Sequence, residues 1–378
     1  MKTKILVLGA GFGGLELTTL LSEAVGDRLD LTLIDKSDSF IFGFSKLDAI
    51  FGRMTPEAIK VPYKNIVKPG VRFVQDSITA IDPVAKRVTT SNGVYEADVL
   101  VVALGADYDM AATPGLSEVG NEFYSVPGAL KVRELLPNFT SGHAMIGVIS
   151  APYKCPPAPS EMALMLHDYL KERGVRDACQ ISLLVPFGVP IPPSPESSKA
   201  LMSAFEERGI KFYPKKGVQR LNTAKRVAVL DDGTEMPFDL FLGIPKHCVP
   251  EVVAKSGMTE NGWIPANPKN LKTKFDGVYA IGDVSSTGVP KAGVFAEGAA
   301  QVAAASILYD LKHGSEPTPY LGQGSCYIEY GGGKVGRVDV DFLSGPEVSG
   351  KFYDPSADMV KEKEKFGSSR RARWFGMD

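Results

Sequence analysis

"KILVLGAGFGGLELTTLLSEA", residues 4–24, decides the fold of this chain. An apolar run is followed by three glycines at the spacing G-x-G-x-x-G (Gly9, Gly11 and Gly14) and then by an amphipathic helical pattern. A second apolar run, "LTLIDK", ends on Asp35. Such glycines let a pyrophosphate approach the backbone at a helix N-terminus, and the acid receives the ribose hydroxyls. The stretch therefore predicts a Rossmann-like βαβ unit that binds a dinucleotide.

The composition is that of a globular protein larger than one ordinary domain. The chain has 378 residues, of which 44% are hydrophobic and 23% charged, and its formal net charge is -2. This length predicts two or three domains, and the charge gives no electrostatic case for nucleic acid. The N-terminus lacks the pattern of a signal peptide, no apolar run approaches the length of a membrane span, and the four cysteines form no CxxC pair. We expect a cytoplasmic protein with no structural disulfide and no metal site.

Two later stretches indicate which dinucleotide is bound. "ADVLVVALGADYD" ends an apolar run in a small-residue turn at Gly105, and "FDGVYAIGDV" places Asp283 just after Gly282. Both resemble signatures of flavoproteins with two dinucleotide-binding domains, the pyridine nucleotide–disulfide reductase superfamily. The resemblance implies FAD, with Asp283 bonded to the flavin ribitol. An Ala-rich helix from Lys291 to Leu311 is expected to direct its N-terminus at the isoalloxazine, where it favours negative charge.

The chain contains an internal repeat. Residues 70–106 and 209–245 each combine a strand, a three-stranded meander with an Asn-Gly or Asp-Gly turn, and an apolar strand. The shared letters Lys-Arg-Val align residues 86–88 with residues 225–227, an offset of 139. The repeat predicts two halves with the same architecture.

The second half keeps the βαβ pattern but not the glycine loop. We expect strands at 143–150 and 180–186 and a helix at about 159–173. The loop reads "VISAPYKCPPAPSE", residues 148–161, and its prolines remove N–H groups that a phosphate would need. Nicotinamide is therefore not the expected electron donor. The alternative is a domain that has decayed to a purely structural role.

Two cysteines, one of them in the altered loop, suggest what this loop does. Cys155 lies in "PYKCPPAP" and Cys326 in the later "GSCYIEYGGGKVGRVDVDF". These stretches resemble the sulfide-oxidising flavoproteins, namely the sulfide:quinone oxidoreductases and the flavoprotein subunit of flavocytochrome c sulfide dehydrogenase. The resemblance implies that Cys155 and Cys326 form a redox-active pair beside the flavin. In the same way, "VPKAGVFAEG" implies that Lys291 lies near the flavin ring.

The implied reaction suits these residues. Hydrosulfide attacks a disulfide sulfur, one cysteine keeps a persulfide, and the other is released as a thiolate that passes two electrons to the flavin. The position of Cys155 at the start of a helix, next to Lys154, predicts a lowered thiol pKa.

Other candidate residues are expected to be structural. Cys179 and Cys248 are expected to pack in the interior. None of the four histidines has a metal-ligand spacing, and His247 is expected to be a hydrogen-bonded histidine, with a proton relay as the alternative. Glu161 is expected to serve the first turn of its helix, with acid–base chemistry as the alternative.

The chain also departs from the families that it resembles. The flavocytochrome subunit attaches FAD through a cysteine shortly after the second strand, whereas "FIFGFSKLDAIFG" has none here, so FAD is expected to be non-covalent. Many quinone-reducing members have a third essential cysteine before the position of Cys155. Residues 1–154 contain no cysteine, so the chain is a two-cysteine variant.

The predicted fold class is α/β, with two Rossmann-like domains of the glutathione-reductase type and a small C-terminal α+β segment. The predicted domains are 1–112 with 260–318 for FAD, 113–259 with the cysteine loop, and 319–378 packed over the flavin. The expected catalytic residues are Cys155, Cys326 and Lys291. The expected cofactor-binding residues are Gly9, Gly11, Phe12, Gly13, Gly14, Asp35, Lys36, Ala103, Gly105, Gly282, Asp283, Lys291 and Ala292.

The C-terminal stretch bears on the electron acceptor. "MVKEKEKFGSSRRARWFGMD", residues 359–378, combines aromatic residues with three arginines. A basic aromatic helix suits peripheral contact with a membrane and with a quinone, and the alternative is a helix that caps the core.

Taken together, the sequence favours an FAD-dependent enzyme that oxidises sulfide, or a related small sulfur compound, and reduces a quinone. The alternatives are a flavoprotein that reduces a cytochrome, an enzyme like type II NADH dehydrogenase, and a non-enzymatic flavin redox sensor; a homo-oligomer is left open.

Overall fold

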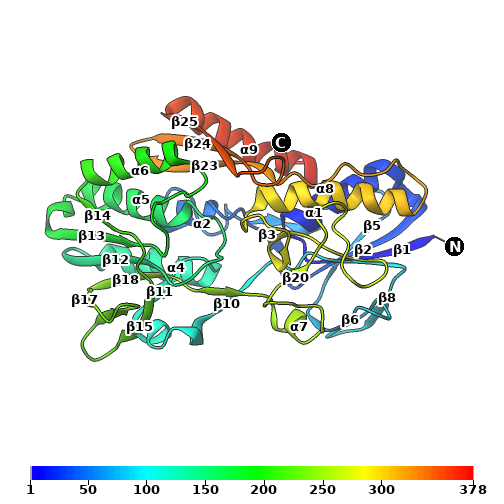
Figure 1. The fold of residues 1–378 in the computed structure, drawn as a ribbon, viewed down its shortest axis with the longest axis horizontal. Helices are drawn as coiled ribbons and strands as arrows, with labels where there is room; N and C mark the ends of the chain where they lie inside the picture. Colours follow the sequence, from blue (N-terminus) through cyan, green and yellow to red (C-terminus); the bar gives the residue numbers. More distant parts are fainter. Residues whose placement is uncertain (1, 378) are drawn as a thin grey trace.

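Two five-stranded parallel sheets lie side by side in the computed structural model, which describes residues 2–377 (Figure 1). In spatial order, the first sheet contains β21 (Val278–Ala280), β9 (Val99–Val102), β1 (Thr3–Leu8), β2 (Leu29–Asp35) and β5 (Val71–Gln75). The second contains β11 (Asn121–Glu122), β18 (Leu240–Ile244), β12 (Gly142–Val148), β13 (Cys179–Leu184) and β14 (Ile210–Tyr213). Four strands correspond in the two sheets, β9-β1-β2-β5 and β18-β12-β13-β14, whereas the edge strand comes last along the chain in the first sheet and first in the second. This order confirms the predicted α/β fold with two Rossmann-like halves.

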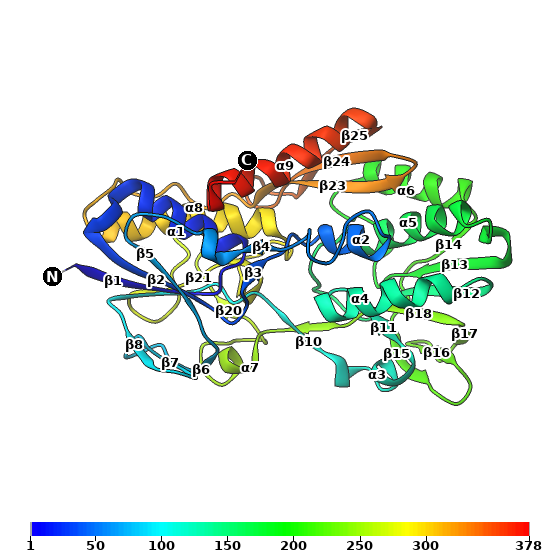
Figure 2. The same cartoon turned by 180° about the vertical axis from the view of Figure 1, so that it is seen from behind.

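Helices cover each sheet and bury its apolar side chains. The first sheet packs against α1 (Phe12–Val25) and α8 (Gly293–Asp310), and the second against α5 (Ala158–Glu172) and α6 (Pro195–Glu207) (Figures 1 and 2). Val7 and Leu8 of β1 and Ile146 and Val148 of β12 are fully buried. Each such side chain contributes about 1.5–3 kcal/mol when it is removed from water. The central strands are therefore fixed, and with them the turns at their carboxyl ends.

The second βαβ unit has nearly the predicted bounds. The predicted strands at 143–150 and 180–186 are β12 and β13, and the predicted helix at 159–173 is α5. Each bound differs from the prediction by no more than two residues.

Each half also carries a three-stranded meander, as the repeat predicted. The first contains β6 (Ile78–Asp82), β7 (Arg87–Thr90) and β8 (Val94–Glu96), and the second β15 (Val218–Asn222), β16 (Val227–Leu230) and β17 (Glu235–Pro237). Lys86 and Arg226, 140 positions apart, occupy the same turn position with φ of 49° and 52°. The predicted offset of 139 is therefore wrong by one residue, because it aligned identical letters rather than equivalent turn positions.

The chain passes between the halves through two short antiparallel strands. These are β10 (Asp107–Asp109) and β19 (Lys246–Cys248), and they pair with each other (Figure 1).

The remaining elements are short. The helices are α2 (Ser45–Ile50), α3 (Leu116–Val119), α4 (Val126–Leu135) and α7 (Glu251–Ala254), and the two-stranded pairs are β3 (Ser39–Phe40) with β4 (Val61–Pro62) and β20 (Ile264–Pro265) with β22 (Ser285–Ser286). The domain bounds given above stay a prediction.

The C-terminal segment lies across both halves (Figures 1 and 2). It consists of the antiparallel strands β23 (Gln323–Gly331), β24 (Lys334–Asp341) and β25 (Ser349–Ser356), followed by α9 (Ala357–Phe375). Trp374 is fully buried, Phe375 is 5% exposed, and the Trp374 indole N–H donates to Glu16 Oε2 at 2.7 Å. Trp374 and Phe375 therefore pack into the core of the first half, as the alternative of a core-capping helix expects, and peripheral contact of the C-terminal segment with a membrane stays a prediction. Within residues 2–377, no helix is long and apolar enough to cross a bilayer.

Candidate active site

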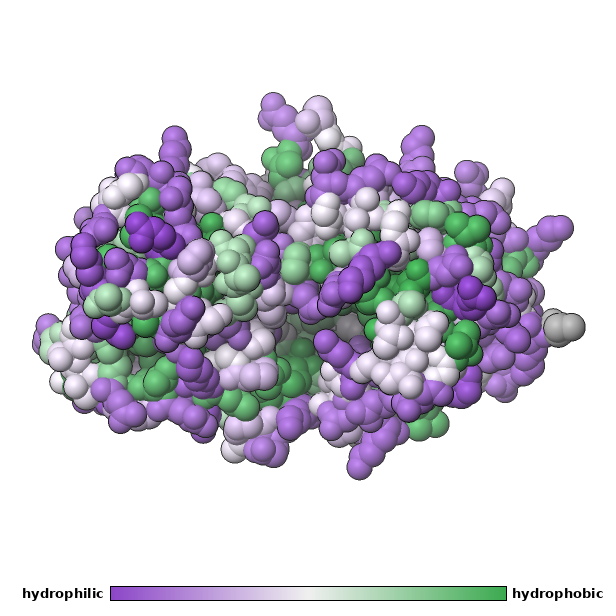
Figure 3. Space-filling model, turned by 90° about the horizontal axis from the view of Figure 1, so that it is seen from below, coloured by the Kyte–Doolittle hydropathy of each residue, from purple (hydrophilic) through white to green (hydrophobic). Residues whose placement is uncertain are grey.

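A cavity of about 540 Å³ lies between the two halves, and the surface seen from below is hollowed at their junction (Figure 3). Most of the predicted cofactor-binding residues line it: Gly9, Gly11, Phe12, Gly13, Asp35, Lys36, Ala103, Gly105, Gly282, Asp283 and Ala292. Gly14 and Lys291 lie behind this lining. Cys155 and Glu161 line the same cavity from the second half. The fold thus brings the first glycine loop and the altered second loop to one space.

The first loop has the geometry of a phosphate cradle. Gly9 has φ of 98°, and a Cβ on Gly14 would lie 1.9 Å from the Gly9 carbonyl oxygen, so both positions require glycine. A Cβ on Gly11 would meet no atom within 4 Å. Asp35 Oδ2 accepts the Ala10 N–H at 2.8 Å, which holds the carboxylate at the strand end. Because a helix leaves its first N–H groups without intrahelical partners, the start of α1 fits the diphosphate of FAD.

The second loop has no such cradle. Pro157 is the N-cap residue of α5, and neither it nor Pro159 has an N–H to offer. The Ala158 N–H donates to the Cys155 carbonyl oxygen at 2.9 Å, and the Ser160 N–H donates to the Pro157 carbonyl oxygen at 3.0 Å. The amides at this helix start are therefore either missing or used within the loop.

Backbone contacts fix Cys155. Its φ of 53° lies in the left-handed region, which costs a non-glycine residue about 1–2 kcal/mol. Its N–H donates to the Lys291 carbonyl oxygen at 2.8 Å, which ties the loop to the segment that leads into α8. Cys155 and Cys326, the latter on β23, are free thiols that pack against the same apolar cluster. The fold thus packs the two predicted cysteines against one apolar cluster, and of the two Cys155 lines the cavity.

Both thiols have raised pKa values. Burial raises the pKa of Cys155 well above its usual range and that of Cys326 to about 12, and the Glu161 charge adds to both shifts. The predicted lowering of the Cys155 pKa is wrong, because desolvation outweighs the Ala158 amide and the Lys46 ammonium, which act in the other direction. Lys46, on α2, was not predicted; the only signal was that it is the single lysine in the apolar stretch "FIFGFSKLDAIFG".

Glu161 lies in the first turn of α5, as predicted, but its side chain also contacts a distant strand. Its carboxylate is buried at 2% exposure and accepts the Glu329 N–H of β23 at 3.1 Å. Burial raises its pKa to about 7. Glu329 in turn accepts from Lys363 of α9 at 2.6 Å and from Arg53 at 3.2 Å. A buried charge network therefore connects the cysteine loop to the C-terminal helix.

Lys291 lies under the turn that carries Asp283. Its Nζ donates to the Asp283 carbonyl oxygen at 2.6 Å and lies 3.3 Å from the centre of the Trp263 ring. Burial lowers the pKa of Lys291 to about 8 and raises that of the Asp283 carboxyl. The lysine therefore supports the turn and does not line the cavity with its side chain.

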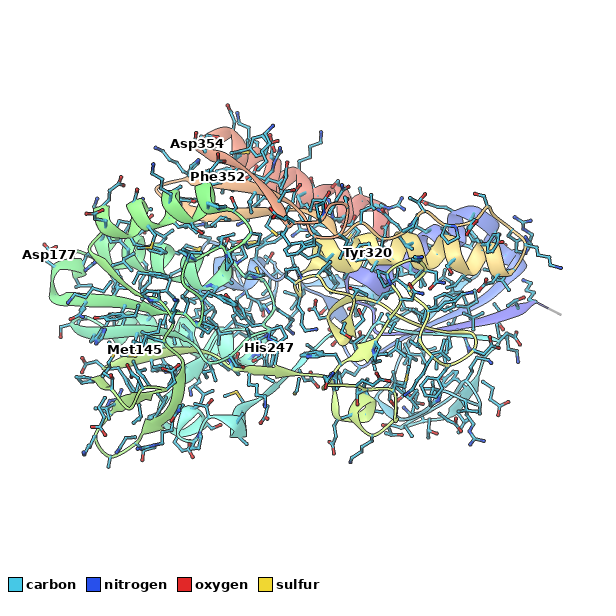
Figure 4. The ribbon with its side chains drawn as sticks, viewed as in Figure 1. Met145, Asp177, His247, Tyr320, Phe352 and Asp354 are labelled. Carbon is cyan, nitrogen blue, oxygen red and sulfur yellow. The ribbon has the colours of Figure 1, made fainter. Side chains whose placement is uncertain are left out.

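The two other cysteines and His247 do not line the cavity. Cys179 is buried in β13, and Cys248 lies on β19, away from the cavity lining. His247 lies where the halves meet (Figure 4), and its Nδ1 is 2.9 Å from the Pro245 carbonyl oxygen. The prediction of a hydrogen-bonded histidine is confirmed for Nδ1 only, because Nε2 is buried without a partner within residues 2–377.

Comparison with known proteins agrees with this geometry. Residues 160–306 match the pyridine nucleotide-disulphide oxidoreductase family. The chain is 25% identical over 370 residues to the mitochondrial sulfide:quinone oxidoreductase of Mus musculus, covering 91% of this chain and 79% of that protein. It is 28% identical over 362 residues to the sulfide-quinone reductase of Aquifex aeolicus, covering 88% and 82%. A type II NADH:quinone oxidoreductase of Staphylococcus aureus is 34% identical, but over 136 residues only, 35% of this chain and 33% of that protein.

Solved structures extend the match to the whole fold. The X-ray structure of the Aquifex aeolicus sulfide:quinone oxidoreductase superposes with a TM-score of 0.86 at 24% identity, covering 98% of this chain and 91% of that one. A Plasmodium falciparum NDH2 structure in complex with NADH gives a TM-score of 0.74 at 14% identity, covering 99% of this chain and 97% of that one. Residues 160–306 thus match the pyridine nucleotide-disulphide oxidoreductase family, most of the chain is similar to the sulfide:quinone oxidoreductases, and the protein is an FAD-dependent oxidoreductase.

Proposed function

We propose that this enzyme oxidises sulfide, or a related small sulfur compound, at Cys155 and Cys326 and passes the electrons through FAD to a quinone. One observation carries the proposal: the second βα turn presents a cysteine to the cavity where the first presents a phosphate cradle. The sulfide and quinone named for the relatives above support the same assignment.

The cavity supports non-covalent binding of FAD. The first-loop amides would hold the diphosphate, which has room beside Gly11. Asp35 would bind the ribose, and Asp283 would bind the ribitol. Of the four cysteines, Cys155 alone lines the cavity within residues 2–377, so the proposed sulfur chemistry leaves no thiol to attach the flavin. When bound, FAD accepts two electrons from one donor and returns them to a second.

The sulfur step starts from the oxidised pair. Hydrosulfide attacks one sulfur of the Cys155–Cys326 disulfide, the S–S bond breaks, and a persulfide remains on one cysteine while the other is released as a thiolate. That thiolate then bonds to the outer sulfur of the persulfide and forms a Cys–S–S–S–Cys bridge, and this step releases the persulfide proton and two electrons, which bound FAD would accept. Because burial disfavours the thiolate of either cysteine, the released sulfur needs rapid oxidation or a proton. Glu161, whose pKa is about 7 and whose charge reaches both thiols, is suited to give and take that proton.

The same network supports a quinone site at the C-terminal segment. Lys363 Nζ lies 5.1 Å from the centre of the Phe44 ring, and Phe366 lies between Phe44 and Tyr327 at centroid distances of 6.4 and 5.8 Å. Aromatic faces can enclose a quinone ring, and Lys363 with Glu161 can supply the two protons that its reduction takes up. Since quinones reside in the bilayer, the proposal includes peripheral attachment at the cytoplasmic membrane face. A cytochrome acceptor is the alternative.

The structure argues against the type II NADH dehydrogenase alternative. That activity needs a second dinucleotide site, whereas the amides at the start of α5 are missing or used internally. The similarity to the NADH:quinone oxidoreductase covers 35% of the chain.

An anaerobic assay of the FAD-loaded protein with sulfide tests the proposal. We expect sulfide to reduce a short-chain ubiquinone analogue, and the same assay with cytochrome c in place of quinone to be slower. A faster reaction with cytochrome c would replace the quinone by a cytochrome. The absence of sulfide oxidation with either acceptor would overturn the proposed function.

A further inference from the structure

A group of polar side chains lines or borders the cavity beside Cys155 and takes no part in the steps above. It consists of Lys46, Lys154, Tyr124 and His247, which we call the basic subsite. Lys46, Lys154 and Tyr124 line the cavity, and His247 packs on the Tyr124 ring with the centroids 5.4 Å apart. Four elements of both halves thus meet next to the reactive cysteine.

The two lysines carry charge without a carboxylate partner. Lys154 Nζ donates to the Ala106 carbonyl oxygen at 2.7 Å and lies 4.5 Å from the centre of the Tyr108 ring, and Lys46 Nζ donates to the Tyr124 carbonyl oxygen. Within residues 2–377, neither ammonium lies within 4.0 Å of a carboxylate oxygen. Each ammonium has three donors and uses one on a carbonyl, so both retain donors for an anion.

The nearby carboxylates do not neutralise this charge. Glu122 accepts the backbone N–H groups of Tyr124 and Ser125 at 2.7 and 2.8 Å. Asp107, Asp283 and Glu161 also line the cavity, and within residues 2–377 none of them lies within 4.0 Å of either ammonium. The two ammonium groups of the subsite therefore have no ion-pair partner and can attract an anion.

Two buried polar atoms in the subsite have no partner within residues 2–377. Tyr124 Oη and His247 Nε2 are unpaired, in side chains that are 5% and 4% exposed. Because His247 Nδ1 faces the Pro245 carbonyl oxygen, Nδ1 carries the proton and Nε2 is an acceptor. Tyr124 Oη can donate. An unpaired buried polar group costs about 1–3 kcal/mol, so a ligand that pairs with both is favoured.

We propose that the basic subsite binds a small sulfur anion that carries one proton, hydrosulfide, in position to attack the disulfide of Cys155. The ammonium groups and the phenol donate to the anion, and His247 Nε2 accepts its S–H. This inference rests on the proposed function and adds the residues that select the substrate. A proton-free anion of similar size satisfies the lysines but leaves the histidine unpaired.

Anaerobic isothermal titration of the FAD-loaded Cys155→Ser protein tests the subsite, because this variant cannot form the disulfide that hydrosulfide attacks. The probes are sodium hydrosulfide and sodium bromide, whose anion is of similar size and carries no proton. We expect hydrosulfide to bind more tightly than bromide. In the same background, Lys154→Met should weaken both probes by about tenfold or more, and Lys154→Arg should restore them. His247→Phe should weaken hydrosulfide alone, and the exposed Lys334→Met is the matched control.

The outcomes separate the two proposals. If hydrosulfide binds equally to the Lys154→Met and Lys334→Met proteins, the subsite is overturned even when the wild-type enzyme oxidises sulfide. If His247→Phe weakens both probes equally, selection of a protonated anion is overturned. If the anion binds as predicted but the wild-type enzyme does not oxidise sulfide, the subsite stands and the proposed function fails.

Discussion

The two βα turns of this protein occupy equivalent places in two equivalent sheets and have opposite chemistry. The turn after β1 is made of glycines, approaches its neighbours closely, and leaves the amides of α1 open to the cavity. The turn after β12 is rich in proline and holds a cysteine with φ of 53°, and the amides of Cys155, Ala158 and Ser160 all donate to backbone carbonyl oxygens. Four of the five strands have the same order in both sheets, including the strand that leads into each turn. The comparison teaches that the fold sets where a ligand meets the protein, whereas a few turn residues set which chemistry happens there.

The largest expected effect comes from removing the thiol of the second turn. Cys155→Ser should lower sulfide-dependent quinone reduction by about 10³-fold or more, because no disulfide can form. The measurement is the steady-state rate of the FAD-loaded protein. Cys248→Ser, which changes a cysteine outside the cavity lining, should keep the wild-type rate. A Cys155→Ser enzyme with more than a tenth of that rate would refute the role of the second turn.

Adding a methyl group at Gly11 in the first turn should weaken FAD binding without lowering the stability of the apoprotein. A Cβ on Gly11 meets no protein atom within 4 Å, so Gly11→Ala should weaken FAD by roughly 100-fold, two to three kcal/mol, with little change in apoprotein Tm. Gly14→Ala should instead lower the Tm, because its Cβ would lie 1.9 Å from the Gly9 carbonyl oxygen. FAD titration and thermal unfolding distinguish the two. Unchanged FAD affinity in Gly11→Ala would contradict the cradle.

Glu161 beside the second turn should give stability a pH dependence. Its pKa is about 7 in the folded protein, above the ordinary value of 4.5, so the folded state binds more protons between these two pH values. Stability should therefore fall as pH rises from about 4.5 to 7, by at most about 3 kcal/mol, and then level off. Urea unfolding across this range measures the slope. Glu161→Gln should flatten it, and an equal slope in both proteins would place the titration elsewhere.

The smallest expected effect concerns the helix that follows the first turn. Arg373 of α9 pairs with Glu16 of α1 at 2.9 Å, and the Glu16 side chain is 3% exposed. Arg373→Met should leave a buried carboxylate with fewer partners and lower stability by about 2 kcal/mol, allowing for the partial exposure of the arginine. Urea unfolding of this variant is compared with that of Lys365→Met, which changes an exposed position of the same helix. Equal urea midpoints for the two variants would show that the contact between α9 and α1 does not stabilise the protein.

Regular patterns predicted the fold and part of the site. The glycine spacing, the internal repeat and the prolines around Cys155 depend on neighbouring residues, so the sequence carries them directly. The pKa of Cys155 could not be predicted in the same way, because desolvation depends on side chains from distant segments. Lys46 and the Glu161–Glu329 contact were missed for that reason, since their partners lie far away in the chain. The aromatic residues of α9 suggested a membrane surface because their pattern does not show which side faces the core.

The central claim is that the second turn exchanged a nicotinamide nucleotide for a sulfur donor, and anaerobic stopped-flow reduction of the bound flavin tests it most directly. The FAD-loaded wild-type protein is mixed with sulfide and, separately, with NADH at equal concentrations. We predict that sulfide reduces the flavin about 100-fold faster than NADH or more, a difference of roughly 2.7 kcal/mol in barrier. Flavin reduction by NADH at a rate equal to or above that with sulfide would contradict the account.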